Sequence, residues 1–464
     1  MAAPAQAQRG PGVNVFDESK PMWQTMLVFL IPLMLANLLQ SMSQTFNYIF
    51  LGRMLGVQAL AAVAGVFPLV FLLFAFIIGT ANGSTVLIGQ AFGAGDGHRV
   101  KKVAGTALGA TILFSFVIAI FGWFFSEPML HLLGTPASIF ADANLYTKVI
   151  FAGMPLFFPP IMYTTFLRGV GDSKTPLYFL ILGTICGISF TPMFIQGWFG
   201  LPHMGVLSPA IAGMLTQCII MPAMLTYLQV TNHPLRFTME TLQDMLFDVK
   251  ILGMILKIGI PTGIQMIVVS LAEIAVIGFV NRFGASATAA YGAVNQIIGY
   301  VQFPAISLSI AASIFGAQCI GAKREDKLGA VVRSAVALNY AVNGLLIVLC
   351  YIFANTIIGW FIIDPKVIDV AHGLLVITLW SYILWGNSAV LSGVMRSSGT
   401  VLWPTINGMA AVCLVEVPAA FILMHYYGLA GVWMGYPIAF AFALCAQFTY
   451  YTFFWKKSTH ERLV

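Results

Sequence analysis

The sequence predicts an all-α polytopic membrane protein with twelve transmembrane helices in two six-helix bundles. Three observations support this prediction. The 464 residues are 59% hydrophobic and only 8% charged, with a mean hydropathy of +0.91, whereas soluble proteins carry about 25% charged residues. Apolar runs of about 20 residues, the length that crosses a bilayer, recur along the whole chain. The two halves of the chain also resemble each other.

Each predicted span is an apolar run bounded by polar, glycine or proline residues. In order, the spans are expected to begin near Met22, Gln58, Lys102, Ser138, Thr175, Met204, Lys250, Ser286, Leu328, Val367, Val401 and Leu429. With this order, only four of the 22 Lys and Arg residues fall on one side of the membrane, namely Arg53, Lys148, Arg282 and Lys366. Positive residues concentrate in cytoplasmic loops, so we expect a cell (inner) membrane protein with both termini in the cytoplasm. Because the net charge of +6 comes from these loops, it does not indicate nucleic acid as a partner.

The internal repeat is visible as short matches that occur in the same order in both halves. At an offset of 228 residues, the matched pairs are Gly56 and Gly284, Ala62 and Ala290, Gln90 and Gln318, Gly93 and Gly321, Arg168 and Arg396, Gly171 and Gly399, and Pro176 and Pro404. At an offset of 226 they are Pro192 and Pro418, and Gly205 and Gly431. Each half holds an even number of spans, so we expect parallel repeats related by a pseudo-two-fold axis along the membrane normal, with a cavity between the bundles.

These boundaries divide the chain into five parts. We expect an N-terminal cytoplasmic tail over 1–21, a first six-helix half over 22–229, a cytoplasmic linker over 230–250, a second half over 251–455 and a C-terminal tail over 456–464. The linker is the most polar internal segment, which is typical of a connection outside the membrane.

Four motifs give the sequence a family resemblance. They are LGRMLGVQALAA after the first span, GQAFGAG at the end of the second, LRGVGDSKTP after the fourth and GLAGVWMG before the last. In this order and spacing they resemble the multidrug and toxic compound extrusion (MATE) family over roughly residues 22–455. The resemblance implies a secondary antiporter that exports organic, often cationic, compounds by alternating access in exchange for protons or sodium ions. Membrane lipid and small organic substrates are then the expected partners, and the protein is expected to be a monomer.

An ion-coupled antiporter needs a group that binds the ion, and the chain offers few. Of its 16 acidic residues, only Glu273 and Glu416 fall near the middle of predicted spans, both roughly 13–18 Å from a membrane face, whereas the others lie in the tails, the loops, the linker or at span ends. A charged residue at this depth costs roughly 2.5–3.5 kcal/mol on insertion, so intramembrane acids are candidates for function. We expect Glu273 to be the main proton acceptor and Glu416 its partner. Both could also be purely structural, hydrogen-bonded between helices or permanently protonated.

The first half departs from the resemblance. Many family members carry an aspartate in the first span and an asparagine and an aspartate in the fifth, where this chain has Asn47, Gly187 and Thr191. Other relatives place an acid in span 7 near Val269, one helical turn from Glu273. We therefore expect ion coupling to reside in the second half, by protons rather than sodium because few carboxylates are available for a hard cation.

Polar residues inside the spans are candidates to face the substrate cavity, although most such residues join helices by hydrogen bonds. The candidates are Gln40, Gln44, Asn47, Asn82, Gln265, Asn295, Gln296 and Asn387. Other classes fit less well. A flippase for a lipid-linked precursor is the main alternative, but every Lys and Arg lies near a membrane face. The His and Cys spacings predict neither a metal site nor an enzyme, and no cofactor is expected.

Overall fold

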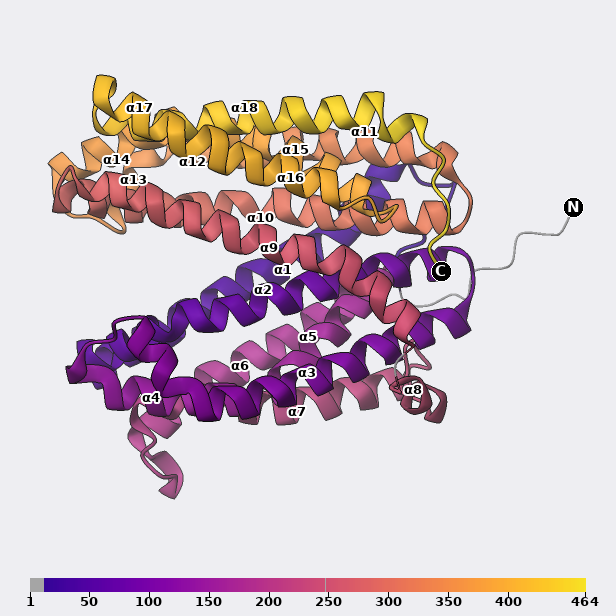
Figure 1. Ribbon diagram of the computed structural model, residues 1–464, viewed down its shortest axis with the longest axis horizontal. Coiled ribbons are helices and arrows are strands. Elements are labelled where there is room, and N and C mark those ends of the chain that lie inside the picture. Colours follow the sequence, from indigo (N-terminus) through magenta and orange to yellow (C-terminus); the bar gives the residue numbers. More distant parts are fainter. Residues whose placement is uncertain (1–11, 247) are drawn as a thin grey trace, which may run out of the picture. The chain divides into compact units, whose positions relative to one another are not determined.

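The computed structural model describes residues 12–246 and 248–464, and these form helices joined by turns and loops (Figure 1). The predicted N-terminal tail therefore lies outside the described residues over 1–11, as does residue 247 of the linker. Among the described residues, eleven helical stretches are long and apolar enough to cross a membrane, and a bent helix pair makes a twelfth if it is counted as one span. This agrees with the twelve predicted spans.

The chain packs into two compact units. Unit 1 contains Leu35–Gly259, and unit 2 contains Val13–Met34 and Ile260–Leu463. Two long helices, α1 (Met22–Phe50) and α9 (Val249–Asn281), contribute residues to both units. Each contains a proline near the point of division, Pro32 in α1 and Pro261 in α9.

Unit 1 is a helical bundle in which α3 packs against α2, α4 and α5, while α6 packs against α7. After α1, its elements are η1 (Leu51–Leu55), α2 (Val57–Gly93), α3 (Gly97–Leu132), α4 (Ala137–Ala152), α5 (Met154–Gly169), α6 (Lys174–Gln196), η2 (Trp198–Gly200), η3 (Gly205–Leu207), α7 (Ser208–Val230) and α8 (Met239–Asp244). The pair α4–α5 is bent by 51°. The bend coincides with Gly153 and with Pro155 in the first turn of α5, which lacks a backbone N–H.

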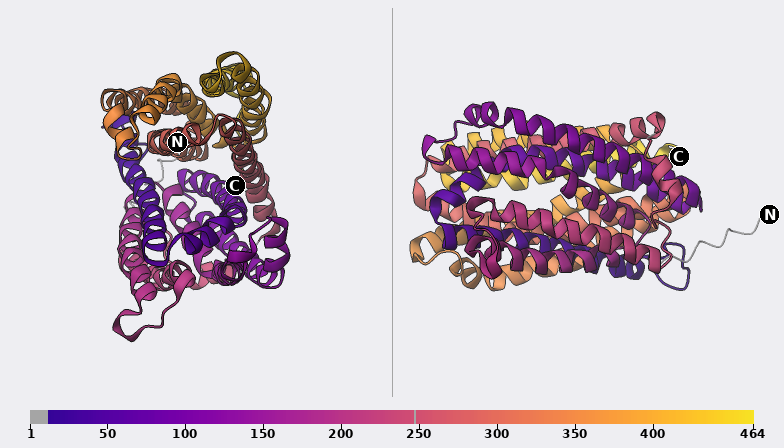
Figure 2. Two further views of the ribbon diagram at one scale, coloured as in Figure 1. Left: turned by 90° about the vertical axis from the view of Figure 1, so that its left-hand side faces the viewer. Right: turned by 90° about the horizontal axis from the view of Figure 1, so that it is seen from below.

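Unit 2 is a second bundle in which α15 lies against both α10 and α18 (Figures 1 and 2). After α9, its elements are α10 (Ala285–Gly321), η4 (Glu325–Lys327), α11 (Leu328–Leu338), η5 (Asn339–Asn343), α12 (Gly344–Ile352), α13 (Ala354–Gly359), α14 (Pro365–Thr378), η6 (Leu379–Ser381), α15 (Tyr382–Arg396), α16 (Leu402–Ala410), η7 (Ala411–Glu416), α17 (Val417–Tyr427), α18 (Leu429–Phe453) and η8 (Trp455–Lys457). One buried apolar cluster of this unit is formed mainly by α10, α14 and α18.

The repeat extends to backbone conformation. Gly56 turns the chain from η1 into α2 with a φ of 90°, and Gly284 turns it from α9 into α10 with a φ of 93°. Residues with a side chain rarely adopt such angles. The matched glycines therefore give both halves the same tight connection between their first two long helices.

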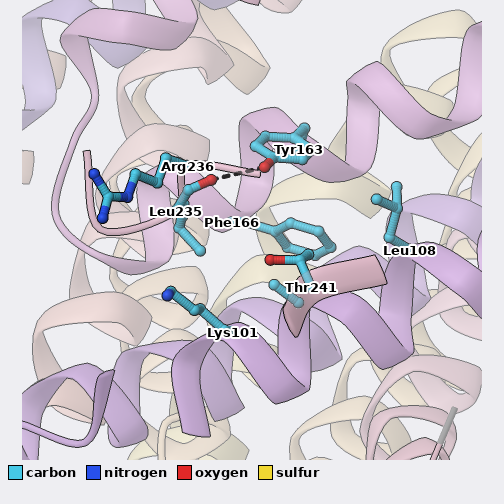
Figure 3. A pocket seen from close by; sticks show the side chains of 8 residues that line it. Lys101, Leu108, Tyr163, Phe166, Leu235, Arg236 and Thr241 are labelled. Atoms are coloured by element: carbon cyan, nitrogen blue, oxygen red, sulfur yellow. Dashed lines mark hydrogen bonds between the residues drawn. The ribbon is translucent and has the colours of Figure 1, made fainter. Parts of the chain in front are cut away.

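The linker is fastened to unit 1 at two places. Its short helix α8 packs on α3, where Gly105 leaves room: a Cβ there would lie 2.6 Å from the Cβ of Asp244. Lys101 Nζ also lies 3.2 Å from Glu240 Oε2, and Lys102 Nζ lies 2.9 Å from Asp248 Oδ2. A cavity of about 10 Å³, room for about one water molecule, remains beside these contacts (Figure 3).

The second attachment involves the loop before α6. The Tyr163 hydroxyl donates a hydrogen bond of 2.7 Å to the Leu235 carbonyl of the linker. The carboxylate of Asp172 accepts from the backbone N–H groups of Lys174 and Thr175 through Oδ1, which caps α6, and its Oδ2 faces the buried His233 of the linker at 3.6 Å. Asp172 therefore ties the start of α6 to the linker.

Substitutions at Asp172 should separate the effect of its hydrogen bonds at the start of α6 from the effect of its contact with His233. Asn is as good a helix N-cap as Asp, whereas Ala at a cap costs about 1 kcal/mol, roughly a fivefold change in a local opening equilibrium. We expect tryptic cleavage after the exposed Arg236 to be about fivefold faster in Asp172→Ala and less affected in Asp172→Asn. Equal cleavage rates in native protein and Asp172→Ala would contradict this role.

The pH dependence of this attachment follows from the charge of Asp172. Burial alone would raise the pKa of its carboxyl group, but His233 and Thr175 lower it, and the net pKa lies below its usual value. A group with a lowered pKa stabilises the fold above its unfolded pKa of about 4, and that contribution is lost as the pH falls through the folded value. The Asp172 contribution should therefore be constant near neutral pH and disappear only in strong acid.

Candidate functional site

The carboxylate of Glu273 is held by two tyrosines in unit 2. Tyr291 donates a hydrogen bond of 2.9 Å from its hydroxyl to Glu273 Oε2, and Tyr436 donates one of 3.1 Å to the same oxygen. The two hydroxyl oxygens are 3.4 Å apart. Because the three residues lie on α9, α10 and α18, this cluster joins three helices around one acid.

The connections between helices bring these residues to a similar depth. Glu273 lies eight residues before the end of α9, and Tyr291 lies six residues after the start of α10. At about 1.5 Å per residue, these positions are roughly 12 and 9 Å from the turn at Gly284. Tyr436 lies seven residues into α18. The glycine turn thus sets the register that allows Tyr291 to reach the acid.

Glu416 is the more buried of the two acids, with only 3% of its side chain exposed. It ends η7, a short π-helical segment, and is followed closely by Pro418. Pro418 lacks the N–H that would bond the carbonyl of Leu414 in a regular α-helix, which explains an irregular turn here. Within the described chain, Glu416 Oε1 is buried without a hydrogen-bond partner.

Neither of the two acids has an oppositely charged partner within the described chain, whereas buried charged groups are usually paired. None of the ion pairs among the described residues involves Glu273 or Glu416. Each of them is therefore a buried or half-buried carboxyl group of a membrane-spanning segment that has no basic partner among the described residues.

Aromatic side chains enclose this cluster, and the sequence reasoning missed them. The rings of Tyr291 and Trp433 meet edge to face with centroids 5.0 Å apart, and Tyr436 packs against Phe440. Tyr382 lies near both acids and close to Gln302. The signal available in the sequence was a tyrosine within otherwise apolar spans, which is weak because tyrosine is also an ordinary core residue.

The corresponding region of unit 1 carries no acid. Asn47 Oδ1 accepts a hydrogen bond of 3.1 Å from the Thr191 hydroxyl, which joins α1 to α6. Gly187, one turn away on α6, has open space where a side chain would lie. At the repeat offsets of 228 and 226, Tyr291 and Tyr436 correspond to the buried residues Val63 and Ala210. The acid and both tyrosines therefore belong to the second half alone.

The other predicted cavity residues divide into three groups. Asn387 accepts a hydrogen bond of 2.9 Å from Asn339, and Gln265 accepts one of 3.4 Å from Arg396, so both join helices within unit 2. Asn295 lies beside the Tyr291 hydroxyl, one turn further along α10, and is the one of these that belongs to the Glu273 cluster. The structure leaves Asn82 half-buried and Gln40, Gln44 and Gln296 exposed.

The fold is that of a multi-pass membrane protein, and comparisons with known proteins place it in the class of transporters. The MatE family model matches residues 32–193 and 261–422, once in each half. The chain is 47% identical over 450 residues to the probable multidrug resistance protein YoeA of Bacillus subtilis, covering 96% of this chain and 97% of that protein. The chain therefore belongs to the MATE family of transporters, and both the twelve-span prediction and the two-half repeat are confirmed.

Two further similarities agree with this assignment. The probable multidrug resistance protein YpnP of Bacillus subtilis is 28% identical over 432 residues, which is 92% of this chain and 94% of that protein. A crystal structure of a mutant of the MATE transporter VcmN from Vibrio cholerae superimposes with a TM-score of 0.87 at 19% identity, covering 94% of this chain and 98% of that one. The latter similarity shows the fold.

Proposed function

We propose that this protein is a secondary active antiporter that exports organic, cationic or amphipathic drug-like compounds by alternating access, driven by proton influx. The observation that carries the proposal is the Glu273 cluster with Glu416 nearby, two acids in membrane-spanning helices without a basic partner among the described residues. The relatives named as multidrug resistance proteins support the substrate class.

A proton fits the Glu273 site better than a metal cation. A hard cation requires several oxygen ligands around it, whereas the described contacts of the Glu273 carboxylate are with two hydroxyl groups that donate to it. A proton needs one acceptor oxygen.

The coupling ion can be identified in proteoliposomes loaded with a fluorescent organic cation. We expect an inward proton gradient, with the outside acidic and sodium absent, to increase efflux severalfold over vesicles without a gradient. A sodium jump at constant pH should leave efflux at the basal rate. Efflux that responds only to sodium would overturn proton coupling, and efflux that responds to neither gradient would overturn secondary antiport.

Orientation and domain boundaries are part of the same proposal. With the termini and the 230–250 linker on the cytoplasmic side of the cell membrane, the positively charged loops face the cytoplasm, as is usual. The proposed halves over 22–229 and 251–455 follow the sequence repeat. They differ from the packing units, because α1 and α9 each contribute residues to both units.

A further inference from the structure

The Glu273 cluster contains more hydrogen-bonding contacts than hydrogens. Tyr291 and Tyr436 are 4% and 5% exposed, and each hydroxyl group carries a single hydrogen. Three contacts connect the group: both hydroxyls reach Glu273 Oε2, and they also lie 3.4 Å from each other. The two hydroxyl hydrogens can satisfy only two of these three contacts at once. Which two contacts they form depends on how strongly Glu273 Oε2 accepts hydrogen bonds.

We propose that Tyr291 and Tyr436 are positioning residues that convert the protonation state of Glu273 into a change in how three helices are held together. The proposal rests on the proposed function of Glu273 as the proton-binding group. When the carboxylate is ionised, both hydroxyls donate to Oε2 and tie α10 and α18 to α9. Charge-assisted bonds of this kind are about twice as strong as neutral ones.

Protonation weakens this tie. A proton from water on one side of the membrane binds Oε1, the oxygen that neither tyrosine contacts. Oε2 then becomes a neutral carbonyl oxygen, a weaker acceptor. Either hydroxyl can now turn its hydrogen to the other tyrosine, which lies at 3.4 Å. When the proton leaves to water on the opposite side, both hydroxyls return to Oε2.

Packing alone does not require these hydroxyl groups. The repeat-related positions Val63 and Ala210 are buried in unit 1 without a hydroxyl. The Tyr291 ring is held by Trp433 through an edge-to-face contact that phenylalanine would keep. The titratable groups that act on Glu273 are these two tyrosines and, from η7 and α15, Glu416 and Tyr382. A Tyr→Phe change therefore removes a donor while leaving the ring in place.

The test uses full-length protein in proteoliposomes and two readouts. One is export driven by a proton gradient, and the other is substrate counterflow, an exchange of labelled for unlabelled substrate without any ion gradient. The variants are Tyr291→Phe, Tyr436→Phe, their combination and Glu273→Gln. Tyr351→Phe is the matched control, because its hydroxyl contacts Val376 and Trp380 in unit 2 and no acid.

We expect Tyr291→Phe and Tyr436→Phe each to lose about tenfold in gradient-driven export, the effect of losing a hydrogen bond to a charged group, and the combination of the two to lose more. Counterflow should stay within about twofold of native in each, because alternating access needs no net proton transfer there. Tyr351→Phe should match the native protein in both assays.

The outcomes separate this inference from the proposed function. Full gradient-driven export in both tyrosine variants, together with its loss in Glu273→Gln, would overturn the inference and leave the proposed function standing. An equal fall in export and counterflow would show a merely structural role and would also overturn it. Full gradient-driven export in Glu273→Gln would overturn the assignment of Glu273 as the proton-binding group, on which this inference rests, and full export in Glu416→Gln as well would overturn coupling through these acids.

Discussion

Glu273→Gln is expected to reduce gradient-driven export to the background of protein-free vesicles while substrate counterflow continues. Glutamine keeps the size and hydrogen-bonding capacity of the side chain but cannot bind and release a proton near neutral pH. Its amide oxygen can still accept from Tyr291 or Tyr436, so the cluster is expected to remain folded. The measurement is the initial export rate under an imposed proton gradient, with counterflow measured on the same preparation.

Glu416→Gln should have an intermediate effect, within about tenfold of native, because it removes a like charge near Glu273 while the proton-binding group remains. Asp369→Asn is the matched control, since it neutralises an exposed acid on α14 of the same half. Native rates in both Glu273→Gln and Glu416→Gln would rule out coupling through these acids. A loss of rate in Asp369→Asn would indicate that the assay responds to charge in general.

Gly431→Ala is expected to have the largest effect on stability. Gly431 lies in the first turn of α18, where α17 approaches so closely that a Cβ would collide with the Leu423 carbonyl and lie 2.7 Å from the Met424 nitrogen. These are backbone atoms of a packed helix and cannot move aside as a flexible side chain can. Overpacking of this kind costs about 1–3 kcal/mol, and α17 directly follows the segment that carries Glu416.

The expected result is a marked loss of folded protein, measured by thermal unfolding in detergent with size-exclusion detection. Gly299→Ala is the control, because a Cβ there on α10 would meet nothing within 4 Å. It should be neutral or slightly stabilising, since alanine favours a helix over glycine by about 0.5–1 kcal/mol. If the two variants unfold at the same temperature, close packing at Gly431 contributes nothing measurable.

Two kinds of feature could be predicted from the sequence: the membrane spans and the two acids within them. The spans could be recognised because a helix that crosses a bilayer needs an apolar run of a certain length. Glu273 and Glu416 could be recognised because acidic residues are rare near the middle of such runs. The division of the fourth span into α4 and α5 was not predicted, since proline and glycine occur in many spans without a bend of 51°. The π-helical turn that ends at Glu416 was likewise not predicted, since other spans contain a proline and remain α-helical, as α6 does at Pro192.

Hydrogen-bond partners that lie far apart in the sequence could not be predicted from apolar runs or from the scarcity of acids. Tyr436 lies 163 residues from Glu273, and only the packing of α18 against its neighbours brings its hydroxyl to the acid. Asn387 looked like a cavity residue by its polarity alone, yet its bond to Asn339 depends on a helix 48 residues away. A single sequence without known contacts contains too little information to select these pairs from many similar polar and aromatic residues.

Because α1 and α9 each contribute residues to both packing units, the two halves of the chain cannot be produced as separate polypeptides with complete cores. Unit 2 includes Val13–Met34, and Phe29 meets Phe315 there with ring centroids 5.5 Å apart. A second half produced alone from the linker onward would lack this segment and expose the surface it covers. A first half produced alone would lack the beginning of α9, whose Gly259 packs against Gly79. The two repeated halves are therefore not separable modules, since each needs a segment of the other to complete its packing unit.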